Sequence, residues 1–164
     1  MGLVPMRSAK DREEKTLVNT KLATPSPLLG TWKLQSYVTH YLDTGENVES
    51  FGTHPSGYLS YSSDCRMYGI VVHEGRTPPR DVVPTDAEKS ELFSGMGAYA
   101  GTFTIEGDTV SHHVDISWNE AWTGTTQVRH FKIEGNSLHI QSAAAKDPVD
   151  GRLSYATLIW TKLT

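Results

Sequence analysis

From Leu28 to the end of the chain, apolar and polar residues alternate mostly with a period of two. This period is typical of half-buried β-strands, in which successive side chains point to opposite faces of the sheet. Short polar segments rich in Gly, Asn, Asp and Ser interrupt the alternation and mark turns. The pattern predicts eight strands, at residues 30–42, 57–62, 66–73, 98–106, 109–117, 125–134, 137–142 and 153–163.

The segments between these strands carry turn and helix signals. Glu106-Gly107-Asp108 and Glu134-Gly135-Asn136 are typical of tight hairpins, because Gly and Asn tolerate a positive φ. Thr85-Asp86-Ala87-Glu88 has the form of a capping box and Gly95 is a suitable terminator, so one short helix is expected between them.

Strands joined mostly by hairpins predict an all-β fold, an eight-stranded antiparallel up-and-down β-barrel with one short helix. A β-sandwich is the alternative. Closure of the barrel would remove exposed sheet edges and leave an interior wide enough for one small ligand.

One face of each predicted strand then points into the barrel. In the first strand this face carries Trp32, Leu34, Ser36, Val38 and His40. The later inward faces mix large apolar side chains with a few polar ones, which are costly to bury unless they are paired or meet a ligand. These later sets are Tyr99, Gly101, Phe103 and Ile105; Val110, His112, Val114 and Ile116; and Gln127, Arg129, Phe131 and Ile133.

Composition divides the chain into two parts. Residues 1–27 hold five basic and three acidic residues but none of the Trp, Tyr, Phe or His. Such a segment cannot build a core, so we expect a disordered polar tail at 1–27 and one barrel domain at 28–164. The tail also lacks the apolar stretch of a secretory signal.

Charge and cysteine content narrow the partners and the compartment. The net charge of −4 and the pI near 5.9 argue against nucleic acid, because phosphate contacts need clustered Lys and Arg. No apolar run approaches the roughly 18 residues of a membrane span, so no membrane partner is expected. The single cysteine, Cys65, excludes an intramolecular disulfide and favours a reducing compartment, so we expect a cytoplasmic protein. A homodimer is left open.

His112 and Arg129 are the leading candidates for chemistry. Imidazole titrates near neutral pH, so His112 is the expected acid or base, and a hydrogen-bonded core histidine is the alternative. The planar fork of Arg129 suits a carboxylate, enolate or carbonyl oxygen. The alternative for Arg129 is an internal ion pair with Asp115 or Glu120. The neighbouring His113 is expected to face outward.

Aromatic residues supply further candidates. Tyr61 and Tyr99 can donate a phenolic proton to a substrate oxygen, although strand tyrosines more often pack and hydrogen-bond at a barrel mouth. Trp118 and Trp122 share one loop and suit a stacking wall over a flat ligand, or simply close the barrel end. The seven histidines show no i, i+4 helical pair and there is no Cys pair, so neither a metal nor another cofactor is expected.

The order of these motifs resembles the lipocalin-like domain family, a bacterial and fungal branch of the calycin barrels. The resemblance covers roughly residues 28–164. One departure is Cys65, where the family's turn commonly has Gly after Asp. The matching segments are Leu29-Gly30-Thr31-Trp32-Lys33-Leu34, which contains the Gly-x-Trp of the opening strand, followed by residues 55–61, 64–67, 99–105, 110–114, 122–129 and 158–160.

The resemblance implies two kinds of function. Similar barrels in fungal and bacterial biosynthetic pathways are cofactor-independent cyclases, isomerases or dehydratases that act on polyketide or terpenoid intermediates. Classical lipocalins only carry apolar ligands. We therefore predict a cofactor-free enzyme that binds a mostly apolar, oxygenated intermediate and promotes its cyclisation, isomerisation or dehydration. A carrier without chemistry is the alternative, and an interaction module with a side-chain-filled barrel is a third reading.

The residues predicted for the site follow from these faces and loops. The predicted catalytic residues are His112, Arg129 and Tyr99, and the predicted ligand-binding residues are Tyr61, Phe103, Trp118, Trp122, Gln127, Phe131, Ser36 and Val38.

Overall fold

A computed structural model describes residues 26–147 and 150–163. The predicted polar tail therefore lies outside the described residues, except for its last two, Ser26 and Pro27. All eight predicted strands are present with bounds close to those expected. They are β1 (Gly30–Tyr41), β3 (Ser56–Tyr61), β4 (Arg66–Val72), β5 (Met96–Glu106), β6 (Thr109–Ser117), β7 (Thr126–Glu134), β8 (Ser137–Ser142) and β10 (Leu153–Lys162).

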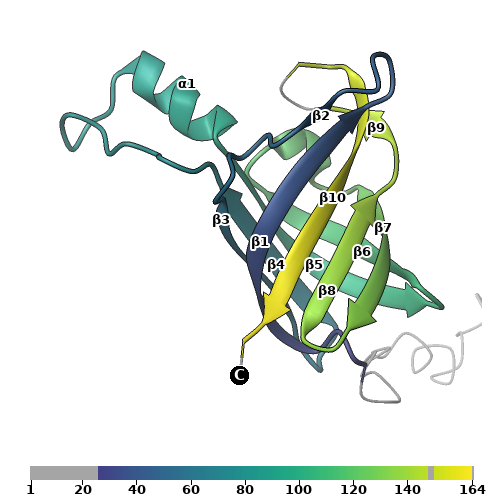
Figure 1. Cartoon of the computed structure of the whole chain (residues 1–164). Coiled ribbons are helices and arrows are strands. Elements are labelled where there is room, and N and C mark those ends of the chain that lie inside the picture. The colour runs from purple at the N-terminus through teal and green to yellow at the C-terminus, as the bar shows by residue number, and fades with distance from the viewer. Residues whose placement is uncertain (1–25, 148–149, 164) are drawn as a thin grey trace, which may run out of the picture.

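These strands form a closed antiparallel barrel (Figure 1). Neighbouring strands pair in chain order, and β10 pairs with β1 to complete the ring. Two further strands of two residues each, β2 (Asn47–Val48) and β9 (Ala145–Lys146), extend the sheet beside β1 and β10. The pairing of β1 with β10 decides between the two predicted architectures, because a sandwich would leave these edges open.

The one α-helix among the described residues, α1 (Asp86–Ser94), confirms the predicted capping box. The Thr85 hydroxyl accepts a hydrogen bond from the Glu88 amide, and the Glu88 carboxylate accepts one from the Thr85 amide in return. No residue of α1 is buried, and the helix stands out from the barrel wall (Figure 1). Within the described residues, no helix is long and apolar enough to cross a membrane.

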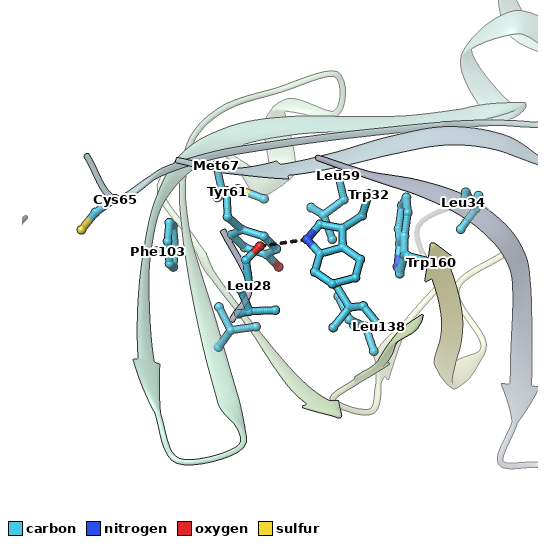
Figure 2. Close-up of a cluster of buried hydrophobic side chains, with 12 residues drawn as sticks. Leu28, Trp32, Leu34, Leu59, Tyr61, Cys65, Met67, Phe103, Leu138 and Trp160 are labelled. Atoms are coloured by element: carbon cyan, nitrogen blue, oxygen red, sulfur yellow. Dashed lines mark hydrogen bonds between the residues drawn. The ribbon is translucent and has the colours of Figure 1, made fainter. Parts of the chain in front are cut away.

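The hydrophobic core fills one end of the barrel. Leu28, Trp32, Tyr61 and Trp160 converge there in a cluster of buried side chains (Figure 2). The Trp32 indole N–H donates to the Leu28 carbonyl oxygen at 2.8 Å, so this buried donor has a partner. The same hydrogen bond holds the segment before β1 against the core. The opposite end carries α1, β2 and β9 (Figure 1).

The inward face of β1 changes phase at Gln35. Leu34 pairs with Trp160, whereas Ser36 pairs with Ile159, so Gln35 is an extra residue in β1. An extra residue of this kind is a β-bulge, which bends the strand and reverses which of the following side chains point inward.

The bulge corrects the predicted face of the first strand. Beyond it, Tyr37, Thr39 and Tyr41 line the barrel interior, whereas Ser36 and Val38 lie along a separate groove on the outer side. The prediction that Ser36 and Val38 share a face with Trp32 is therefore wrong, because it assumed an uninterrupted alternation.

A second bulge lies in β6. Gly101 of β5 pairs with Val114, and the preceding Ala100 pairs with Ile116, so Asp115 is the extra residue. Ile116 is consequently turned outward and is 64% exposed. Its predicted place on the apolar inner face is wrong for the same reason as in β1.

Candidate functional site

Between the core and the loop-bearing end, the barrel encloses a cavity of about 410 Å³. Small-molecule sites span about 300–1,000 Å³. Small inward residues leave this space open: Gly69, Gly97 and Ala156 all line it, and a Cβ at Gly69 would meet nothing closer than 3.5 Å. The cavity contradicts the reading in which side chains fill the barrel.

An aromatic wall borders the cavity on the loop between β6 and β7. The rings of Trp118 and Trp122 meet edge to face with centroids 4.9 Å apart, and Trp122 meets Tyr99 in the same way at 5.6 Å. The Trp118 indole N–H donates to the carbonyl of Phe93 at the end of α1. All but Phe93 line the cavity, so this loop forms part of the cavity wall.

His112 lies at the centre of a buried hydrogen-bonded chain. Its Nε2 is 2.8 Å from the Tyr61 hydroxyl and its Nδ1 is 2.8 Å from the Tyr99 hydroxyl. The side chain is 1% exposed. Burial, the nearby Arg129 guanidinium and His113 lower the pKa of His112 to about 3. The ring is therefore neutral at physiological pH, and both nitrogens are occupied by tyrosines.

The burial of Tyr61 fixes which groups donate and which accept in the hydrogen bonds that join Tyr61, His112 and Tyr99. Tyr61 is 2% exposed and has only His112 as a partner among the described residues, so its O–H must donate to Nε2 to avoid a buried unpaired donor. A neutral ring that accepts at Nε2 carries its proton on Nδ1, which donates to the Tyr99 oxygen. The Tyr99 O–H hydrogen is then left over, and Tyr99 lines the cavity.

Arg129 reaches the cavity from β7. One guanidinium nitrogen, Nη1, donates to the Val128 carbonyl at 2.9 Å, and Nη2 lies 3.4 Å from the Gln127 side-chain oxygen. A guanidinium has five N–H donors, so most of its capacity is available to a ligand.

Neither predicted acidic partner pairs with Arg129. Asp115 forms an ion pair with Arg66 at 2.6 Å, and the Glu120 carboxylate accepts from the Thr123 hydroxyl. Arg129 therefore forms no ion pair within the described part of the chain.

Two cavity residues whose hydrogen-bond donors have no partner among the described residues were not among the predicted site residues. Tyr37 packs on Phe51, and its hydroxyl makes no hydrogen bond within the described residues. Burial raises the pKa of Tyr37 to about 12, against the opposing effect of Arg129, so the phenol stays protonated. Trp160 also lines the cavity, and its buried indole N–H has no partner among the described residues.

The sequence holds a weak signal for Tyr37. Inward apolar residues of β1 fall at even positions up to Leu34, after which aromatic residues recur at Tyr37 and Tyr41. This change of phase is what a bulge produces. For Trp160 the sequence shows the inward position but not the missing hydrogen-bond partner, which depends on the packing of other strands.

The structure brings most of the predicted site residues to one place. Tyr61 lies one hydrogen bond behind the cavity wall, Phe103 belongs to the core, and Phe131 packs against it. His113 faces outward as predicted and bonds to Thr104 and Thr126. The predicted residues that line the cavity are His112, Arg129, Tyr99, Trp118, Trp122 and Gln127.

Metal-ligating side chains do not gather in this site. Among the residues that the structure describes, no three His, Cys, Asp or Glu side chains lie close enough together to hold a metal ion.

The chain is similar to one protein family and to a solved structure. The model of a family described as lipocalin-like domain matches residues 29–163. A solved structure of a lipocalin-like protein from Bacteroides uniformis has 15% sequence identity and a TM-score of 0.43, over 83% of this chain and 98% of that one. None of the curated proteins matches this chain.

Proposed function

The chain belongs to the lipocalin-like domain family, and on that basis we propose that it binds a small, mostly apolar ligand with an oxygen-bearing end inside the barrel. The cavity of about 410 Å³ carries the proposal. Its walls combine aromatic and aliphatic side chains with a few polar groups, the usual composition of a small-molecule site. Ligand binding in the barrel interior is also what the family's fold supports.

The binding proposal is tested with a neutral fluorescent probe, N-phenylnaphthylamine, whose emission rises in an apolar site. We expect saturable binding to the full chain, and a loss of at least about tenfold in affinity for Gly69→Leu, which places a side chain in the cavity. Gln141→Leu adds the same side chain at an exposed position that does not line the cavity and should bind like the wild type. Equal binding by both variants would place the probe elsewhere and reject the proposal.

Cofactor-free catalysis on the bound ligand is the second candidate. It is favoured by the arrangement of the Tyr99 hydroxyl and Arg129, two donors that face one cavity. In the enolate route to cyclisation, isomerisation or dehydration of a carbonyl compound, water or hydroxide from the solvent takes up the proton of the α-carbon. The C–H electron pair moves to the carbonyl oxygen, where such donors stabilise the negative charge. A polyketide or terpenoid intermediate with a carbonyl group fits this chemistry.

In this mechanism His112 positions Tyr99 and does not itself transfer the proton. With a pKa of about 3, His112 is a weak base, and both its nitrogens are hydrogen-bonded. Burial holds the pKa of Tyr61 well above its ordinary value, so the Tyr61 hydroxyl does not readily give up its proton to His112. The hydrogen bonds from Tyr61 through His112 therefore polarise and orient the Tyr99 O–H, which acts as a donor to the ligand oxygen.

Catalysis is tested with tetralone, a flat enolisable ketone, by following exchange of its α-hydrogens in heavy water by NMR. We expect exchange faster than in buffer, and a loss of about tenfold or more in Tyr99→Phe and Arg129→Met. His112→Gln should reduce the rate at saturating ketone more than it changes the ketone's affinity. Exchange at the buffer rate would remove enolisation of such ketones from the proposal and leave the binding function in place.

A further inference from the structure

Several polar groups of the cavity wall have a donor hydrogen that no described residue accepts. Arg129 and the Trp160 indole can only donate. Because His112 Nδ1 donates to the Tyr99 oxygen, the hydroxyl hydrogen of Tyr99 is directed away from His112. The Tyr37 hydroxyl, which also faces the cavity, has no acceptor among the described residues. Unpaired buried donors are costly, so a resident ligand that supplies acceptors is strongly favoured over one that supplies further donors.

The charged residue on the barrel wall also favours a ligand that supplies hydrogen-bond acceptors. The eight barrel strands contribute one charged side chain to the lining, Arg129, while the other charged lining residues are Lys146, Asp147 and Asp150, in or beside the short strand β9 at the barrel mouth. Asp150 already accepts a hydrogen bond from Tyr41. The Arg129 guanidinium is half-buried and forms no ion pair within the described residues, so a monoanion entering the barrel would neutralise it.

Arg129 acts on several groups around one space. Burial raises the pKa of Tyr37 and of Tyr61, and the charge of Arg129 opposes that rise. Burial lowers the pKa of His112, and the charge of Arg129 lowers it further. Tyr37 on β1 and Tyr99 on β5 line the same cavity as Arg129 on β7. Three donors from three strands thus surround a region that also contains aromatic and aliphatic walls.

We propose that the ligand of this barrel is an apolar carboxylic acid, bound as its carboxylate by Arg129 with the Tyr37 and Tyr99 hydroxyls donating to the same end. A carboxylate matches the planar guanidinium fork, and its single charge matches the single cation on the eight barrel strands. A phosphate ester, with up to two negative charges, would need a second cation beside Arg129, whereas the other cation of the lining, Lys146, lies on β9 next to Asp147. The apolar body of the acid extends along the Trp118 and Trp122 wall. This inference rests on the proposed binding function and adds the class of ligand.

The test compares acids with their methyl esters at about pH 7, by displacement of N-phenylnaphthylamine from the full chain. Naphthoate and decanoate serve as the two acids, one flat and one flexible, so that a poor fit of one shape does not decide the result. We expect at least one acid to bind about tenfold or more tightly than its ester, since the ester loses the charge-assisted hydrogen bonds.

Variants locate the charge. Arg129→Met should weaken the acid about tenfold or more while leaving the ester within about twofold, and Arg129→Lys should restore part of the loss. Tyr37→Phe and Tyr99→Phe should each weaken the acid by a few-fold and not the ester. A loss that is equal for acid and ester would indicate a structural role for Arg129 and overturn the assignment.

The remaining outcomes separate this inference from the function on which it rests. If acids and esters bind equally to the wild-type chain, the carboxylate assignment fails while cavity binding stands. If the acids, the esters and the probe all fail to bind, the proposed function itself fails. Tighter binding of an aryl phosphate than of naphthoate would overturn the choice of a monoanion.

Discussion

At the scale of single residues, two glycines on the inner face of neighbouring strands have opposite reasons to be small. Gly101 lies opposite the bulge in β6, where a Cβ would come 1.9 Å from the His113 carbonyl oxygen. Gly69 has an ordinary strand conformation and borders the cavity, where a Cβ would meet only ordinary contacts. Close backbone approach requires the first glycine, whereas the second only leaves space.

Alanine substitutions distinguish these roles. Gly101→Ala should destabilise the protein by about 3 kcal/mol, because the backbone of β6 must move away from the new methyl group. Gly69→Ala should be neutral or stabilise it by up to about 1 kcal/mol, because it restricts the unfolded chain without creating a clash. Urea unfolding of both variants measures the difference, and equal effects would contradict the assignment.

His112 gives stability a pH dependence at the same scale. Its pKa falls from 6.5 to about 3 on folding, mainly through burial, so between these values the unfolded chain takes up a proton that the folded chain does not. Stability should therefore fall on acidification below about pH 6.5, by up to about 1.4 kcal/mol per pH unit from this residue.

Between about pH 6.5 and about pH 4.5, His112 contributes to the pH dependence of stability and the carboxylates with lowered pKa values do not. Asp64, Glu74 and Glu88 have pKa values lowered by hydrogen bonds, so their stabilising effect is lost only at lower pH. Urea unfolding at about pH 7, 6 and 5 should show the slope in the wild type and a much smaller slope in His112→Gln. Equal slopes in the two proteins would show that His112 is not the group responsible.

At the scale of the elements, the bulge in β1 decides which side chains face the cavity. Leu34 and Ser36 pair with adjacent residues of β10, so Gln35 is one residue more than the ladder needs. The bulge turns Tyr37 into the cavity. The two hairpin turns with Gly107 and Gly135 at φ 59° follow the local sequence signals directly, whereas the bulges depend on the register with neighbouring strands.

Deletions in β1 test this register. Removing Gln35 should leave a regular ladder with Tyr37 still directed inward and retain a cooperative thermal transition. Removing Lys33, which has a partner on β10, should shift Trp32 and the preceding residues out of register and cost several kcal/mol, because each large apolar side chain contributes about 1.5–3 kcal/mol by burial. Circular dichroism melting of both deletions provides the comparison, and a greater loss on removing Gln35 would contradict the bulge.

At the scale of the whole molecule, the barrel is divided into a packed end and a hollow end. Leu28 and Trp32 close the packed end, and the described chain already contributes there from Ser26, whose hydroxyl accepts a hydrogen bond from the Leu28 amide. The loops at the other end surround the cavity (Figure 1). We propose that the folding unit corresponds to the predicted barrel domain together with this short entry segment.

Truncation tests the proposed domain boundary. A chain that begins at Ser26 should melt within about 2 °C of the full chain and bind N-phenylnaphthylamine with the same affinity, because the core begins at Leu28. A chain that begins at Lys33 loses Leu28 and Trp32 and should not fold cooperatively. A marked loss of stability on removing residues 1–25 would place part of the folding unit before Ser26.

The sequence alone determined the number and order of the main strands and the capped helix, and it favoured the closed barrel over the sandwich. These features follow from alternation, turn residues and a capping box, which act over a few residues. It also indicated that His112, Tyr99 and Arg129 share inward faces, because alternation holds within β5, in β7 and in β6 up to its bulge.

Only the tertiary structure decided which groups meet and which remain unpaired. The bulges at Gln35 and Asp115 arise from register between strands, so local alternation misplaced Ser36, Val38 and Ile116. The pairing of Asp115 with Arg66 leaves Arg129 without its predicted counter-ion, and the contact of Tyr61 with His112 joins residues 51 positions apart. A hydrogen bond or a cavity depends on the simultaneous positions of several strands, and that information is not contained in any one segment of the chain.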